Sequence, residues 1–172
     1  MTATPTGRIN RRNGEDSLEF TRTFRAPIAD VWAAVTESDR LARWIGTWTG
    51  DPTSGHVTFS MNAEGEDVPD ARYDIEACEP PRLLKVTTTD AFGSWRLSVE
   101  LAESEGVTTL VMAQVIDDAE MIENTGPGWD YYLDRLVAAE TGGDVGAIDF
   151  DADYYPAQRD HYLAIQRQIQ EA

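Results

Sequence analysis

Apolar residues recur along the chain with two different spacings, one typical of strands and one typical of helices. The two-residue alternation that is typical of half-buried β-strands recurs in four segments, at 18–25, 56–62, 71–78 and 94–102. A β-branched segment at 82–89 and a segment at 107–116 that is apolar on both faces, as in a central strand, predict two more strands. Turn signals separate the later segments, which favours an antiparallel meander over alternating strands and helices. Between the first two strands, apolar residues recur at helical spacing through IADVWAAVT and again between Ser38 and Gly46. We therefore predict two short helices directly after strand one.

The second period is clearest in GPGWDYYLDRLVAAE, from Gly126 to Glu140, which predicts a long C-terminal helix. Its polar side carries Asp130, Asp134 and Arg135. A single helix of about 15 residues is only marginally stable alone in water, so its apolar side needs a partner surface. We expect a curved antiparallel sheet of six or seven strands, wrapped around the helix with a chamber between them. The apolar side consists of Trp129, Tyr132, Leu133, Leu136, Val137 and Ala139.

Length and composition predict a single globular domain, and the order of the predicted strands and helices predicts the α+β class. The chain has 172 residues, of which 41% are hydrophobic, and this is enough for one sizeable core. Residues 1–16 are predicted to be a flexible N-terminal tail, and residues 17–141 the folded domain. Residues 142–172 form a C-terminal extension with a predicted helix at 155–170, packed on the same domain.

The charge balance disfavours two classes of partner. The chain has 14 basic and 31 acidic residues and a formal net charge of −17, which repels nucleic acids and anionic membrane surfaces. A solvated surface that resists aggregation explains this charge more simply than an acidic docking site. The N-terminal residues contain no apolar run, so we expect neither a secretory signal nor a membrane span, and a cytoplasmic location.

The sequence contains no strong catalytic or metal-binding motif. A phosphate-binding glycine loop, a GxSxG elbow and paired metal-ligand histidines are all missing from it. His56 and His161 are the two histidines, and each is interpreted as a surface or boundary residue. Cys78 is the single cysteine, so no internal disulfide forms and no zinc site is expected. We assign no catalytic residue and no cofactor, and leave open whether the protein is an enzyme.

Three separated phrases resemble a known family. They are FTRTFRAPIADVWAAVTESDRLARWIG at 20–46, CEPPRL at 78–83 and GWDYYLDRL at 128–136. With the order of the elements, they resemble the helix-grip fold of the START-like (SRPBCC) superfamily. Within it they resemble the branch named after the activator of the heat-shock-protein-ninety ATPase. The resemblance implies a hollow domain that takes a small, largely apolar molecule between helix and sheet, and it carries no catalytic set to transfer. The residues after Gly142 extend beyond the family pattern.

The periodicity of the strands and of the long helix predicts which residues line the chamber. The same residues also fit an ordinary packed core, and the resemblance favours the cavity. Gln114 would then place an amide among apolar side chains, where it needs a partner. That partner is a ligand group, a neighbouring backbone group, Arg22 or Tyr73. The expected ligand-binding residues are Phe59, Met61, Tyr73, Trp95, Leu97, Leu110, Met112, Gln114, Trp129, Leu133 and Leu136.

Three functions fit the sequence. The first is binding of a small hydrophobic molecule without catalysis. The second is a cyclase or dehydratase acting on a polyketide-type or aromatic substrate, with Gln114, Tyr73 or Glu140 polarising a carbonyl group. The third is a cochaperone that activates a chaperone ATPase through its acidic surface. A homodimer is compatible with each of them.

Overall fold

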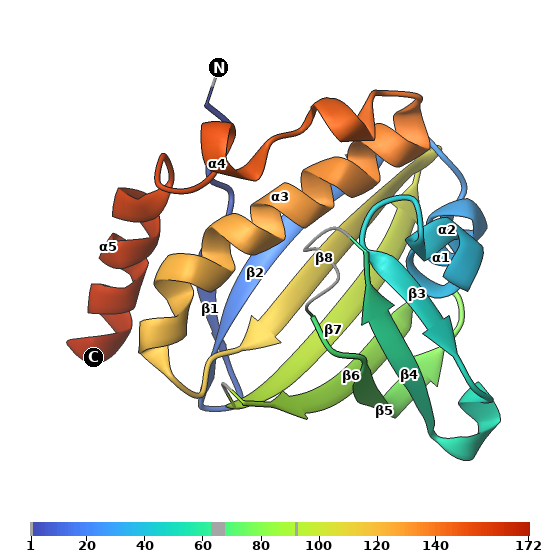
Figure 1. The fold of residues 1–172 in the computed structure, drawn as a ribbon, viewed down its shortest axis with the longest axis horizontal. Helices are drawn as coiled ribbons and strands as arrows, with labels where there is room; N and C mark the ends of the chain where they lie inside the picture. The colour runs from blue at the N-terminus through green and yellow to red at the C-terminus, as the bar shows by residue number, and fades with distance from the viewer. Residues whose placement is uncertain (1, 63–67, 92) are drawn as a thin grey trace. The chain divides into compact units, whose positions relative to one another are not determined.

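The computed structural model describes residues 2–62, 68–91 and 93–172. These residues contain one eight-stranded sheet with the strand order β1-β2-β8-β7-β6-β5-β4-β3 (Figure 1). The strands are β1 (Arg8–Arg12), β2 (Glu15–Phe24), β3 (Gly46–Thr49), β4 (His56–Met61), β5 (Ala71–Glu79), β6 (Leu83–Asp90), β7 (Gly93–Ser104) and β8 (Val107–Val115).

Helices interrupt and follow the meander. Two short helices come directly after β2, as the sequence predicts, and the long helix α3 follows the last strand. The predicted α+β class and order of elements are therefore confirmed. The helices are α1 (Ile28–Thr36), α2 (Ser38–Leu41), α3 (Ile122–Thr141), α4 (Phe150–Asp153) and α5 (Arg159–Gln170), with short 3-10 turns η1 (Pro52–Ser54), η2 (Ala119–Met121) and η3 (Val145–Ala147).

The sheet has more strands in the described residues than the six or seven that the sequence predicts. One addition is the short strand β3, and the other is β1, which lies within the predicted flexible tail. β1 has a single apolar residue, Ile9, so it lacks a hydrophobic alternation. It pairs with β2 through a turn at Asn13 and Gly14, whose φ angles are 54° and 82°. Asn-Gly is the preferred sequence of such a hairpin turn, so this dipeptide was the feature of the sequence that could have predicted β1.

Two compact units make up the chain. The terminal unit comprises Met1–Thr21 and Ala113–Ala172, and the central unit comprises Arg22–Met112. β2 and β8 each contribute residues to both units. The boundaries predicted from the sequence, at residues 16 and 141, remain predictions.

The terminal unit is built on α3, against which α5 packs (Figure 1). The helix begins at Ile122, one turn before the predicted start, so Pro127 lies inside it. It ends where Gly142 adopts a left-handed conformation with φ 77°, the usual C-terminal stop of a helix. Asp130, expected on the solvent side, is instead fully buried. The core of this unit includes Leu18, Phe20, Ile122, Tyr132, Leu133, Leu136, Tyr162 and Ile165.

In the central unit, α1 packs against α2 and β7, and α2 packs against β3. Two indole groups fix this arrangement, because each donates a hydrogen bond to a carbonyl oxygen of α1. Trp44 Nε1 lies 3.0 Å from the oxygen of Ala34, and Trp48 Nε1 lies 2.8 Å from that of Thr36. The buried apolar residues around them are Val31, Ala34, Val35, Leu41, Trp44 and Ile45.

We predict that Leu136→Ala lowers the free energy of unfolding by about 3 kcal/mol, because a fully buried leucine leaves a cavity when truncated. Denaturant unfolding measures this change. Val137→Ala, at the next and half-buried position of α3, is the control and should cost clearly less. Equal costs for the two variants would contradict the observed orientation of the helix.

Candidate functional site

The predicted ligand-binding residues fall into two groups. Seven belong to the central unit and come from β4, β5, β7 and β8, whereas Gln114, Trp129, Leu133 and Leu136 belong to the terminal unit. The central group comprises Phe59, Met61, Tyr73, Trp95, Leu97, Leu110 and Met112.

The pairing register places five members of the central group on one face of the sheet. Residues that pair directly across antiparallel strands point to the same face, and so do alternate residues along a strand. Val57 pairs with Tyr73, which puts Phe59 and Met61 on the side of Tyr73. Two further rows of pairs, Ile75 with Val86 with Leu97 and Thr88 with Trp95, carry this face across β6 to β7. We call it the apolar face, and its members are Val57, Phe59, Met61, Tyr73, Ile75, Val86, Thr88, Trp95, Leu97 and Val99.

The apolar face is not sealed from solvent. Its apolar side chains are all half-buried, although Leu101 farther along β7 is only 4% exposed. Leu110 and Met112 on β8 are also buried, at 1% and 3% exposure. Packed core residues therefore occur farther along β7 and on β8, while the apolar face keeps accessible hydrophobic surface. Such a surface often marks a binding site.

Aromatic rings dominate one end of the apolar face. The rings of Phe59 and Tyr73 lie 5.3 Å apart at an angle of 60°. A Cβ atom at Gly46 would collide with the backbone oxygen of Ser60 and lie 2.9 Å from the Phe59 ring, so glycine allows both the partner strand and the ring to approach here. Trp48 pairs with Phe59 and lies on the same side, a neighbour that the sequence analysis did not include. Trp95 is oriented by a hydrogen bond of 2.9 Å from its indole nitrogen to Asp90 Oδ2.

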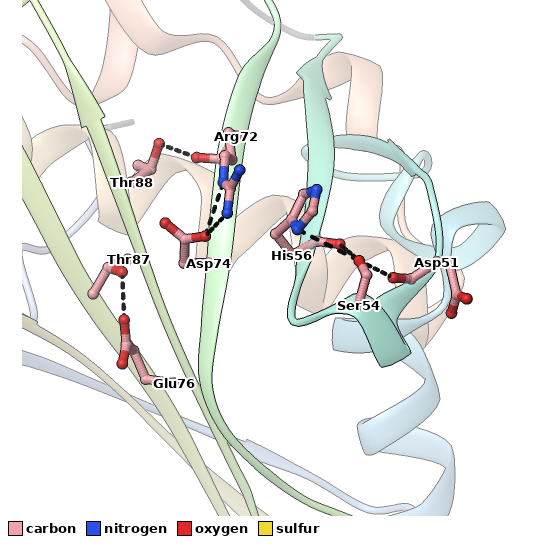
Figure 2. A network of polar contacts seen from close by, with 8 residues as sticks. All are labelled: Asp51, Ser54, His56, Arg72, Asp74, Glu76, Thr87 and Thr88. Carbon is pink, nitrogen blue, oxygen red and sulfur yellow. Dashed lines mark hydrogen bonds and ion pairs between the residues drawn. The ribbon is translucent and has the colours of Figure 1, made fainter.

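The opposite face of the same strands is polar (Figure 2). Arg72 donates to Asp74 Oδ1 through Nε at 2.9 Å, and its Nη2 atom lies 2.8 Å from the same oxygen. Thr87 donates to Glu76 Oε1 at 2.9 Å. These pairs are solvent-exposed and contribute little to stability. They show, however, that the two faces of β4–β7 differ sharply in chemistry.

A serine, a histidine and an aspartate lie close together at the start of β4, but they do not form a catalytic triad (Figure 2). Ser54 Oγ lies 3.4 Å from His56 Nδ1 and donates to the backbone oxygen of Asp51 at 2.6 Å. The Asp51 carboxylate accepts from the Thr53 hydroxyl and amide instead. These hydrogen bonds, the hydroxyl first, hold the pKa of Asp51 below its ordinary value. The cluster therefore caps a turn and does not activate a nucleophile.

In the terminal unit, the buried side chain of Gln114 pairs with the half-buried Trp129. Trp129 Nε1 donates to Gln114 Oε1 at 2.7 Å, and Gln114 is 1% exposed. The partner of the Gln114 oxygen is thus Trp129, which was not among the candidate partners in the sequence analysis. Because indole nitrogen only donates, this bond fixes the carboxamide oxygen toward Trp129. Both residues were predicted to point inward, but the periodicity gave no sign that they meet.

Leu133 and Leu136 are core residues of α3, with exposures of 2% and 0%. Trp129 on the same helix is half-buried. Whether any of the predicted residues contacts a ligand stays a prediction. Within residues 2–62, 68–91 and 93–172, no three His, Cys, Asp or Glu side chains are grouped to hold a metal ion. In the same residues, no helix is long and apolar enough to cross a membrane.

We predict that Trp129→Phe lowers the free energy of unfolding by about 1–3 kcal/mol, because it leaves the buried Gln114 oxygen without its donor. Adding Gln114→Leu should restore part of this loss, and denaturant unfolding of the four proteins in this cycle measures the coupling. Trp95→Phe is the matched control, since its indole bonds to Asp90 at an exposed position. Strictly additive effects of the Trp129 and Gln114 changes would contradict the pairing.

Three solved structures of similar fold cover between 75% and 96% of this chain. The crystal structure of CalU16 from Micromonospora echinospora matches with a TM-score of 0.75 and 22% identity, over 96% of this chain and 99% of that one. Protein EF2215 from Enterococcus faecalis, of unknown function, matches with a TM-score of 0.70 and 20% identity, over 95% and 91% of the two chains. DynU16 matches with a TM-score of 0.64 and 21% identity, over 75% of this chain and 49% of that one. The predicted helix-grip fold is thereby confirmed.

The family comparison is more specific than the fold. No curated protein matches the chain. The family model for Activator of Hsp90 ATPase homolog 1-like protein matches residues 25–140, which is more than half of the chain. This range includes the three phrases from which the resemblance was inferred, except for the first residues of the earliest one. The chain therefore belongs to the family of Activator of Hsp90 ATPase homolog 1-like proteins, within the START-like superfamily.

Proposed function

We propose that this protein binds a small, largely hydrophobic molecule and that the apolar face of β4–β7 is a contact surface for it. The observation that carries the proposal is the half-buried state of the apolar side chains on this face. A sheet face that serves only as core would be sealed, as Leu110 and Met112 are. Accessible apolar surface raises the free energy of the unliganded protein by about 25 cal/mol per Å², and a ligand that covers it recovers this energy.

The chemistry of the apolar face favours an uncharged ligand with a flat ring system. None of its members carries a charged side chain, so a charged group would lose its hydration without gaining an ion pair there. The Phe59 and Tyr73 rings, together with Trp95, offer edges and faces for aromatic contacts. The Thr88 hydroxyl already donates to the oxygen of Arg72 at 2.7 Å, which leaves it to act as an acceptor.

A cyclase or dehydratase is the second candidate. DynU16 is described as a protein of the dynemicin biosynthetic locus, which motivates a role in converting a bound compound. In this chain, the Trp129 bond orients the Gln114 carboxamide so that its NH2 group is the end that donates to a carbonyl group. A carrier releases its ligand unchanged, a dehydratase releases a compound lighter by one water, and a cyclase that does not dehydrate releases an isomer of equal mass with a different chromatographic retention. Mass spectrometry of the released compound separates the two functions.

We predict that the neutral fluorophore N-phenyl-1-naphthylamine binds the protein and that Leu97→Ala weakens this binding about tenfold. The expected loss corresponds to about 1.4 kcal/mol of apolar contact. A fluorescence titration of the purified full chain measures the affinity. The neutral probe avoids repulsion by the net charge of −17.

Ser98→Ala is the matched control, because Ser98 is the next residue of β7 and points to the polar face. It should bind the probe as the unmodified protein does. Circular dichroism and a melting curve establish that both variants fold. Equal affinities for Leu97→Ala and Ser98→Ala, or no binding of the probe by the unmodified protein, would reject the proposed surface.

A further inference from the structure

Both ends of the chain meet at one buried carboxylate of α3. Asp130 is fully buried, and it accepts hydrogen bonds from the backbone nitrogen of Thr6 at 3.0 Å, from the Thr6 hydroxyl and from the Tyr162 hydroxyl. Thr6 lies 124 positions from Asp130 along the chain, and Tyr162 lies 32 positions from it. A buried carboxylate is tolerated only where donors replace its lost hydration. The N-terminal segment and α5 together supply these donors.

Tyr162 occupies a slot formed by two glycines. Its ring is fully buried, and a Cβ atom at Gly7 would lie 2.7 Å from ring atom Cε1. A Cβ atom at Gly126 would collide with the ring as well. The Tyr162 hydroxyl also accepts a hydrogen bond of 3.1 Å from the Gly7 nitrogen. One side chain of α5 thus contacts the N-terminal segment and α3 at the same time.

Further contacts join the N-terminal segment directly to the C-terminal extension. The Ala3 nitrogen donates to the Asp153 oxygen at 3.2 Å, and Gln158 Nε2 donates to the Ala3 oxygen at 3.2 Å. His161 Nε2 lies 2.9 Å from the Gly7 oxygen, a contact that requires a proton on this nitrogen. Residues 3–7 therefore lie along the C-terminal extension as well as against α3.

Both segments lie outside the family match, which spans residues 25–140, whereas Asp130 lies inside it. We propose that the hydrogen-bonded cluster of Thr6, Gly7, Asp130 and Tyr162, here called the latch, couples two segments. Through it, the N-terminal segment (residues 3–7) and α5 dock on α3 cooperatively. Loss of either segment leaves the carboxylate short of donors, so the docking of each depends on the other. A partner that captures residues 3–7 would consequently also release α5. The latch is independent of the proposed ligand and its surface.

Hydrogen exchange of the full chain tests this coupling. Tyr162→Phe keeps the ring and removes the hydroxyl, which bonds to Gly7 and Asp130. We expect the amides of Ala3 and Thr6, which do not bond to that hydroxyl, to exchange about tenfold faster or more. In the reverse direction, Thr6→Val should speed exchange of the α5 amides, because coupling between two segments is reciprocal.

Tyr154→Phe is the matched control. Tyr154 is buried, and its hydroxyl donates to Asp134 Oδ2 of the same helix, α3, at 2.7 Å. This variant should leave exchange at Thr6 unchanged. The latch is overturned if Tyr162→Phe alters exchange at Gly7 alone, or if Tyr154→Phe speeds exchange at Thr6 equally. Should Tyr162→Phe fail to fold, the α5 amides of Thr6→Val decide the question, and unchanged exchange there also overturns it.

Discussion

The pairing register of β4–β7 is the constraint on which the functional interpretation depends. Because side chains alternate between faces, a shift of one residue would exchange the apolar and polar sets of every strand. The observed register aligns Ile75, Val86 and Leu97 in one row and Asp74, Thr87 and Arg96 in the next. The first row belongs to a hydrophobic surface and the second to a hydrated one. The binding hypothesis follows from the accessibility of the first.

The two units differ in what they bury: the central unit leaves apolar side chains partly accessible, and the terminal unit encloses polar groups. In the central unit, the apolar face of β4–β7 keeps hydrophobic side chains partly accessible. In the terminal unit, the polar groups of Gln114 and Asp130 are enclosed and receive donors from distant residues. Enclosed networks of this kind rigidify a structure because each member depends on the others. Accessible apolar surface is the property that a ligand can exploit.

Local periodicity explains which parts of the structure were predictable from the sequence. The strands from β4 onward and the body of α3 follow from hydrophobic spacing, and the same spacing grouped Phe59, Tyr73, Trp95 and Leu97 correctly on one face. β1 was not predicted because its residues are mostly polar, although Asn13 and Gly14 have the sequence of a hairpin turn. Contacts between distant residues have no periodic signature.

Asp130 shows this limit most clearly. On the helical wheel it falls among polar residues, and its burial depends on Thr6 and Tyr162, which no local pattern connects to it. The pairing of Gln114 with Trp129 was not predicted either, because periodicity indicates the face on which a residue lies and not the residue that it contacts. The family resemblance supplied the fold and did not supply these contacts.

An NMR titration with N-phenyl-1-naphthylamine would locate a bound hydrophobic molecule directly. We expect intermolecular nuclear Overhauser effects from the probe to the rings of Phe59, Tyr73 and Trp95, with little change at Thr87 and Arg72 on the polar face. Contacts confined to the polar face, or a probe that binds without approaching these three rings, would contradict the binding surface derived from the register of β4–β7.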